Sequence, residues 1–248
     1  MAKPRHLHHA PITEALVDIR VKTRPGFDVG RFSDLKASLS QRFPKVEERR
    51  GGQFTLRFPP APDAPPAFEE LGLQGYFFKN STEDLIAQFR ADGFTLNKLK
   101  PYSSWDDLLP SALELWQLYQ ATSSPEAVTR VALRYINHIT VPHQRVDFDQ
   151  FFTAAPQVPP ALPQLLRGFL YRVTIVNPEA QLSAHVVQAL DPSLPQPGVT
   201  VILDIDAFRD VDFSPSDPQL EAHFRDLHDF KNMIFFNYLT EETVRLFE

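Results

Sequence analysis

Residues 12–22 alternate between two sets of side chains. One set is wholly apolar and consists of Ala15, Val17, Ile19 and Val21. The other set is mostly charged and consists of Glu14, Leu16, Asp18 and Arg20. Because successive side chains of a β-strand point to opposite faces, this pattern predicts a strand with one buried face and one polar face.

Four helices are predicted, a short one at residues 148–152 and three that carry apolar residues at the spacing of a helix. The first covers residues 32–43. The clearest, residues 105–119, follows Ser104, which is a good N-cap residue. Asp217 and Pro218 open the last helix as its N-cap and first residue.

The remaining strands are predicted from alternation and from turn residues between them. They cover residues 53–58, 75–80, 85–99, 128–141, 170–176, 182–190 and 199–205. The dipeptide Asp92-Gly93 is a hairpin signal inside one of these segments. Two proline-rich segments, 59–66 and 156–163, lack the donors of a sheet ladder and are expected to be exposed connections.

This order of elements predicts an α+β fold made of two βαβββα-like halves. Residues 1–122 form the N-terminal half-repeat and residues 128–248 the C-terminal half-repeat, and together they make one compact unit. The strands are expected to form antiparallel sheet with the helices packed on one face, since only one face of most strands is apolar. The other face is then polar and carries Glu14, Asp18, Arg20, Gln88, Arg90, Arg134 and His138.

Composition narrows the class of protein. There is no cysteine among the 248 residues, which excludes disulfides, thiolate metal sites and a cysteine nucleophile. A net charge of −6 disfavours a protein that binds nucleic acid through a basic field. No long apolar run is present, so we expect a cytoplasmic protein without a membrane segment. Glycine-rich phosphate loops and nucleophile motifs are also missing, so no cofactor is expected.

Four motifs, in order, resemble one family. They are Ala-Pro-Ile with Glu-Ala at 10–15, Leu-Asn-Lys-Leu-x-Pro-Tyr-x-x-Trp at 96–105, Arg-Tyr-Ile-Asn at 134–137 and Leu-Asp-Ile-Asp at 203–206. The chain resembles a sporadically distributed bacterial family of uncharacterised proteins of about this length. The resemblance implies an accessory gene, such as one of a defence or toxin–antitoxin system, and brings no catalytic residues with it.

Arginines on the polar face are the candidate partner-binding residues, because a guanidinium fork recognises carboxylates with defined geometry. They are Arg20, Arg90 and Arg134. A purely structural alternative pairs Arg134 with Asp18 or a similar carboxylate across the sheet.

Asp204 and Asp206 point the same way from one strand, and His185 lies on a neighbouring strand, so these three residues are the candidate ligands of a divalent metal. The structural alternative is a solvated strand end. Asn97 and Tyr102 are expected to support the turn into the long helix. His6, His8 and His9 are expected in a mobile arm, and His223 and His228 have the wrong spacing for a shared metal.

The sequence therefore favours a non-enzymatic protein that recognises a protein partner on its polar sheet face or along a strand edge. Two alternatives stay open. One is a metal-dependent hydrolase that uses Asp204, Asp206 and His185. The other is a nucleic-acid binder with a duplicated sheet as its saddle.

Overall fold

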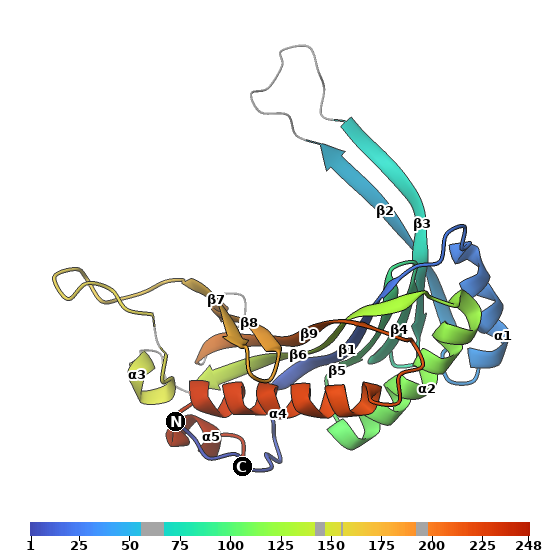
Figure 1. Cartoon of the computed structure of the whole chain (residues 1–248). Helices are drawn as coiled ribbons and strands as arrows, with labels where there is room; N and C mark the ends of the chain where they lie inside the picture. The colour runs from blue at the N-terminus through green and yellow to red at the C-terminus, as the bar shows by residue number, and fades with distance from the viewer. Residues whose placement is uncertain (56–66, 142–146, 155, 192–197) are drawn as a thin grey trace.

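One antiparallel sheet runs through the molecule (Figure 1). The computed structural model describes residues 1–55, 67–141, 147–154, 156–191 and 198–248. In that part of the chain the sheet has nine strands in the order β2-β3-β4-β5-β1-β6-β9-β8-β7. The strands are β1 (Ile12–Lys22), β2 (Lys45–Thr55), β3 (Ala67–Lys79), β4 (Leu85–Arg90), β5 (Gly93–Leu99), β6 (Ala127–Val141), β7 (Leu170–Asn177), β8 (Leu182–Asp191) and β9 (Val199–Phe213).

The two long helices lie against one face of this sheet (Figure 1). The long helix α2 (Trp105–Ser123) packs on β1 and β5, and the long helix α4 (Leu220–Tyr238) packs on β6, β8 and β9. The shorter elements are the 3-10 helix η1 (Val29–Asp34), α1 (Leu35–Leu39), α3 (Phe148–Phe151) and α5 (Glu241–Arg245). Strands with helices on one face make an α+β fold, as the sequence predicts.

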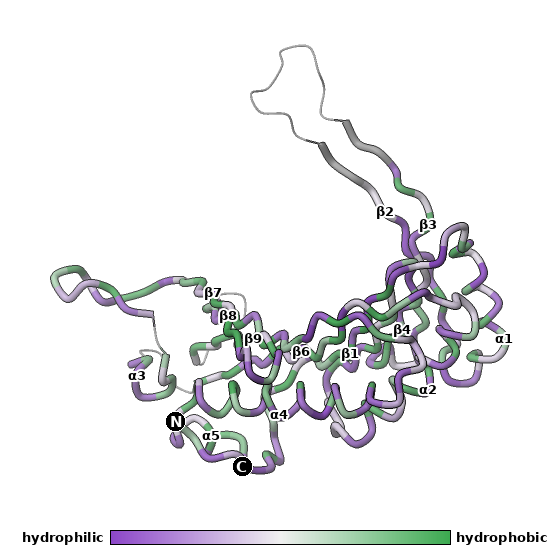
Figure 2. The backbone as a smooth tube through the Cα atoms, viewed as in Figure 1, coloured by the Kyte–Doolittle hydropathy of each residue, from purple (hydrophilic) through white to green (hydrophobic). Residues whose placement is uncertain are grey.

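The core begins at the central pair of strands. Ala15, Val17 and Ile19 of β1 are fully buried beneath the helices. Val17 lies opposite Leu133 of β6, and Ile19 lies opposite Val131, so both strands present the same apolar face. Figure 2 shows hydrophobic and hydrophilic positions alternating along the two long helices, as expected for helices with one buried side.

Local signals explain where the long helices begin. The side chain of Ser104 accepts a hydrogen bond from the backbone N–H of Asp107, at 3.1 Å, and caps α2 as predicted. The last helix starts slightly later than the sequence predicts, at Leu220. Asp217 instead closes the preceding turn, since its side chain accepts from the N–H of Gln219 at 2.7 Å.

The first half contains one strand more than the predicted βαβββα unit. Four strands, β2 to β5, lie between α1 and α2, whereas three lie between α3 and α4. β2 escaped a full prediction because its register with β3 shifts at Arg49/Arg50 and again at Gly51/Gly52, which disturbs the alternation. The proline-rich segment 59–66 and residues 56–58 of one predicted strand lie outside the described residues. β2 and β3 project from one end of the sheet on the side away from α4 (Figure 1).

The segment expected as a mobile arm packs against the end of the chain instead. The N–H of Ala2 donates to the carbonyls of Phe236 and Leu239, and the N–H of His9 donates to Phe247. Figure 1 places both termini beside α5. Within the described residues, none of the helices combines the length and apolar character that crossing a membrane requires.

Candidate functional site

The sheet face away from the long helices carries a row of charged side chains from β4 to β9. Cross-strand neighbours share a face, so the register identifies its members. Asp18 lies opposite Thr95 of β5 and Ala132 of β6, and Arg134 lies opposite Leu16 of β1 and Asp206 of β9. All seven polar residues assigned to this face by alternation share it.

Arg90 is buried at the β4 end of this row. Its guanidinium lies 3.0 Å from a carboxylate oxygen of Asp18, and both side chains are under a tenth exposed. Thr95 donates a hydrogen bond to the same oxygen at 2.6 Å. Arg20 approaches the other oxygen of Asp18 at 3.0 Å and also pairs with Asp92. Arg90 is thus a buried counter-ion, whereas the Arg20 side chain is 41% exposed.

The charge of Asp18 is stabilised by these neighbours. Burial by itself raises the pKa of Asp18, but Arg90, Thr95 and Arg20 together outweigh burial. The pKa of this carboxyl therefore lies below its usual value. Asp18 stays ionised, and with Arg90 it forms a buried ion pair.

Arg134 pairs with a carboxylate across the sheet, as the structural alternative predicted. Its partner is Asp204 and not Asp18. Two parallel hydrogen bonds join the guanidinium to that carboxylate, at 2.8 and 2.6 Å. This pair raises the pKa of Arg134. Its side chain remains 42% exposed.

Arg130 is a member of the row that sequence reasoning missed. It lies 2.9 Å from Asp206 and 3.6 Å from Asp18, and so links the two halves of the row. Its position four residues before Arg134 on the same strand places both on one face, which is the signal that could have found it.

The two aspartates among the candidate metal ligands each pair with an arginine. Asp204 is held by Arg134 and Asp206 by Arg130. His185 shares a 3.0 Å contact with Thr174, and its ring lies 4.9 Å from that of Phe208. Burial raises the pKa of Asp206, although Arg130 opposes that effect. Among the described residues no group of three metal-ligating side chains comes together.

The arrangement also gives little support to nucleic-acid binding on this face. Every arginine of the row pairs with a carboxylate. Paired charges largely cancel the positive field that phosphates require.

Asn97 belongs to the same face, since it accepts from Gln88 at 2.8 Å and donates to Glu14 at 2.5 Å. It therefore bridges strands and does not hold the turn backbone as expected.

The outer strand β7 exposes apolar side chains. Leu170, Tyr171 and Val176 are 77%, 48% and 62% exposed. Leu162 and Leu165, in the segment that leads to β7, are 54% and 75% exposed. Among the described residues β7 pairs with β8 alone, so its outer backbone groups face solvent. The sequence predicted this strand but not its position at the edge, because edge position depends on the order of all strands.

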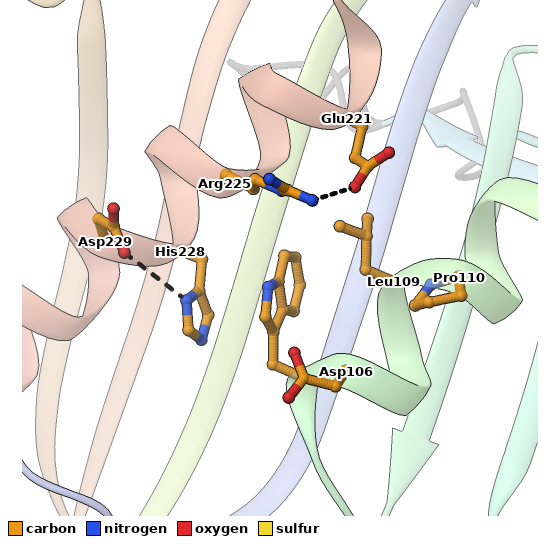
Figure 3. A pocket seen from close by; sticks show the side chains of 8 residues that line it. Asp106, Leu109, Pro110, Glu221, Arg225, His228 and Asp229 are labelled. Carbon is orange, nitrogen blue, oxygen red and sulfur yellow. Dashed lines mark hydrogen bonds and ion pairs between the residues drawn. The ribbon is translucent and has the colours of Figure 1, made fainter.

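The helix side of the molecule is hollowed near the start of α2. One hollow of about 300 Å³ lies between α2 and α4 (Figure 3). Trp105 and His228 stack there with ring centroids 4.5 Å apart, and burial lowers the pKa of His228 to about 4. Arg225 pairs with Glu221 at 2.5 Å. His228 is thus a neutral stacking partner, separate from His223, which stacks on Phe213.

The sequence matches no model of a protein family and no curated protein. The resemblance to a sporadic bacterial family stays a prediction, and function is inferred from the fold and its contacts.

Proposed function

We propose that this protein is a non-enzymatic recognition protein, and that its protein partner adds a strand to the free edge of β7. The observation that carries the proposal is the exposure of Leu170, Tyr171 and Val176 on an edge strand. An open edge presents unpaired N–H and C=O groups, and natural proteins protect such edges with charges, prolines or a covering segment. Exposed apolar side chains on an edge are what an incoming strand buries.

The order of the strands supports an internal duplication, which is part of this proposal. About the central pair β1 and β6, the sheet reads β5-β4-β3 on one side and β9-β8-β7 on the other. In this correspondence β3 is the counterpart of β7. β3 is covered by the additional strand β2, whereas β7 has no such neighbour among the described residues.

The partner strand would thus take the place that β2 takes in the first half. β2 runs antiparallel to β3, so we expect the partner strand to run antiparallel to β7. Its side chains would contact Leu170 and Val176 on one face of the sheet and Tyr171 on the other, since strand residues alternate.

The polar row begins at β9, which β8 separates from β7, and it would contribute specificity to a partner that extends over the sheet. Arg134 and Arg20 are half exposed and remain the proposed contacts for carboxylates of the partner. Arg90 contributes indirectly, because it is buried against Asp18. The resemblance of the four motifs adds that the partner belongs to an accessory bacterial system, such as defence or toxin–antitoxin.

The test combines recovery from the native host with amide exchange. Leu170→Lys with Val176→Lys places two charges on the edge without disturbing buried side chains, and Met233→Lys is a matched change at a 49% exposed residue of α4. We expect a stoichiometric partner with the unaltered chain and with Met233→Lys, and its loss with the double variant. Binding should also slow exchange of the β7 amides.

Three results would count against the proposal. The first is a partner that the double variant retains. The second is a chain that emerges alone from its host. The third is a self-dimer through β7, detected by sedimentation of the purified protein and abolished by the same double variant.

A further inference from the structure

A second hollow lies on the helix side, apart from the sheet face and from the β7 edge. It measures about 700 Å³ and lies between the N-terminal segment, the connection that follows β5, and α4. That volume is within the range of sites for small organic ligands, about 300–1,000 Å³. Its walls come from residues far apart in sequence, such as Leu7, Tyr102, Tyr135 and Asn232.

Lys231 contributes a buried ammonium to this cavity. The residue is 5% exposed, on the face of α4 that carries Leu227, Ile234 and Phe235 toward the core. Its Nζ donates to Oδ1 of Asn232 at 2.7 Å and lies 3.6 Å from the centroid of the Tyr135 ring. In the described part of the chain it has no carboxylate partner.

Burying a lysine ammonium in that position costs free energy unless acceptors replace the water it loses. An ammonium removed from water needs acceptors for its three protons. One amide oxygen and one aromatic face supply only part of them. The remaining donor capacity lies at the wall of a cavity, where an acceptor brought by a ligand can use it.

Two tyrosine hydroxyls provide further donors at the same wall. The hydroxyl oxygens of Tyr102 and Tyr135 lie 2.8 Å apart. Only one proton occupies the bond between them, so the accepting hydroxyl keeps its own proton for another acceptor. Burial raises the pKa of Tyr102 to about 12, and therefore the hydroxyl remains a donor at neutral pH.

The remaining lining residues also favour a ligand that carries negative charge. Its basic and imidazole side chains are Arg5, His6, His8, His9, Lys100 and His228, whereas Asp106 is the one acidic side chain among the lining residues. Arg5 is neutralised by Glu241 and Glu248, at 2.9 and 2.7 Å. The excess of positive charge therefore rests on the lysines and on any histidine that is protonated.

We propose that this cavity binds a small organic anion, whose carboxylate or phosphate accepts from Lys231 Nζ and from the tyrosine hydroxyl pair while its apolar body lies among the aromatic side chains. Carboxylate and phosphate share the property that matters here, a compact oxyanion with several acceptors. The stack of Trp105 on His228 supplies a flat wall at the border with the smaller hollow.

Binding of the anion is coupled to protonation. Burial lowers the pKa of Lys231 to about 7, and a bound anion raises it again. Above pH 7 the protein therefore takes up a proton when the anion binds, and the affinity falls as pH rises. The variant Lys231→Met distinguishes the proton of Lys231 from those of the other titratable groups that line the cavity. These are Arg5, His6, His8, His9, Lys100, Tyr102, Asp106, Tyr135 and His228.

The test uses benzoate, phenyl phosphate and the neutral benzyl alcohol, with binding followed by titration calorimetry and by ligand-detected NMR. We expect at least one anion to bind about tenfold more tightly than benzyl alcohol. The comparison of benzoate with phenyl phosphate distinguishes a carboxylate ligand from a phosphate ligand. Calorimetry at pH 8 in two buffers of different ionisation enthalpy should reveal the uptake of a proton.

Lys231→Met keeps the length of the side chain and removes its charge. We expect this variant to abolish the proton uptake and to lower the affinity for the anion by about tenfold or more. Lys36→Met, at an exposed lysine, should change neither. Tyr102→Phe keeps the ring and removes the hydroxyl. We expect it to lower the affinity for the anion without removing the proton uptake. The inference is overturned if neither anion binds, if benzyl alcohol binds equally well, or if folded Lys231→Met binds the anion as the unaltered chain does.

Discussion

The guanidinium of Arg134 and the carboxylate of Asp204 form a two-pronged pair across the neighbouring strands β6 and β9, with hydrogen bonds of 2.8 and 2.6 Å. The two residues are separated by 70 positions in the chain. Neither directly faces the other in the ladder, because Arg134 lies opposite Asp206. The pair is therefore diagonal. Asp206, which lies opposite Arg134, pairs with Arg130 instead.

The first prediction concerns the strength of this pair. A double-mutant cycle with Arg134→Ala and Asp204→Ala should give a coupling energy of about 0.5–1 kcal/mol, since solvent screens the partly exposed guanidinium. Urea denaturation of the four proteins measures it. Additive effects of the two substitutions would show that the pair contributes nothing to stability.

The buried pair of Arg90 and Asp18 should matter more. Arg90→Met leaves the Asp18 carboxylate buried without its main counter-ion, so we expect a loss of about 3–5 kcal/mol in the free energy of unfolding. The double variant Arg90→Met with Asp18→Leu should recover much of this loss, because neither charge of the buried pair remains. A single variant as stable as the unaltered protein would contradict the burial of this pair.

The pair also predicts a response to acid. The pKa of Asp18 in the fold lies below the roughly 3.9 of an unfolded aspartate. Its charge therefore stabilises the fold above that value, and this contribution is lost as pH falls through the lower folded pKa. Asp18→Asn should therefore reduce the loss of stability as pH falls below about 5. Denaturation in urea at several pH values measures the slope, and parallel curves for both proteins would contradict it.

Lys231 predicts a dependence of the same sign at higher pH. Its folded pKa of about 7 lies below the roughly 10.4 of an unfolded lysine. Between these values the unfolded chain holds a proton that the folded chain lacks. Stability should therefore rise with pH from 7 to 9, by at most about 1.4 kcal/mol per unit. Lys231→Met should remove this rise, whereas Lys36→Met should keep it.

Gly93 is predicted to tolerate no side chain. Its φ is +151°, and a Cβ would lie 2.2 Å from the carbonyl oxygen of Ile19 on the neighbouring strand. Gly93→Ala should destabilise the protein by about 2–3 kcal/mol, because the backbones of β1 and β5 must separate. Gly168→Ala is the matched control, since a Cβ there meets nothing within 4 Å. Equal unfolding midpoints for the two variants would contradict the close approach.

Local patterns in the sequence determined which face each side chain takes. Alternation placed Ala15, Val17 and Ile19 inward and Asp18 on the polar face, and the structure has them so. Ser104 identified the start of α2 in the same way. These inferences succeed because the side-chain period of a strand and the capping of a helix depend on neighbours within a few residues.

Tertiary structure decided which elements meet. The order of the strands placed β7 at an edge of the sheet. The register of β6 with β9 brought Arg134 within ion-pair distance of Asp204. The packing of the N-terminal segment on α4 and α5 enclosed the cavity that holds Lys231. A lysine within an apolar helix stripe was visible in the sequence, but its burial was not. Contacts between residues tens or hundreds of positions apart depend on how the whole chain packs, and no local period encodes them.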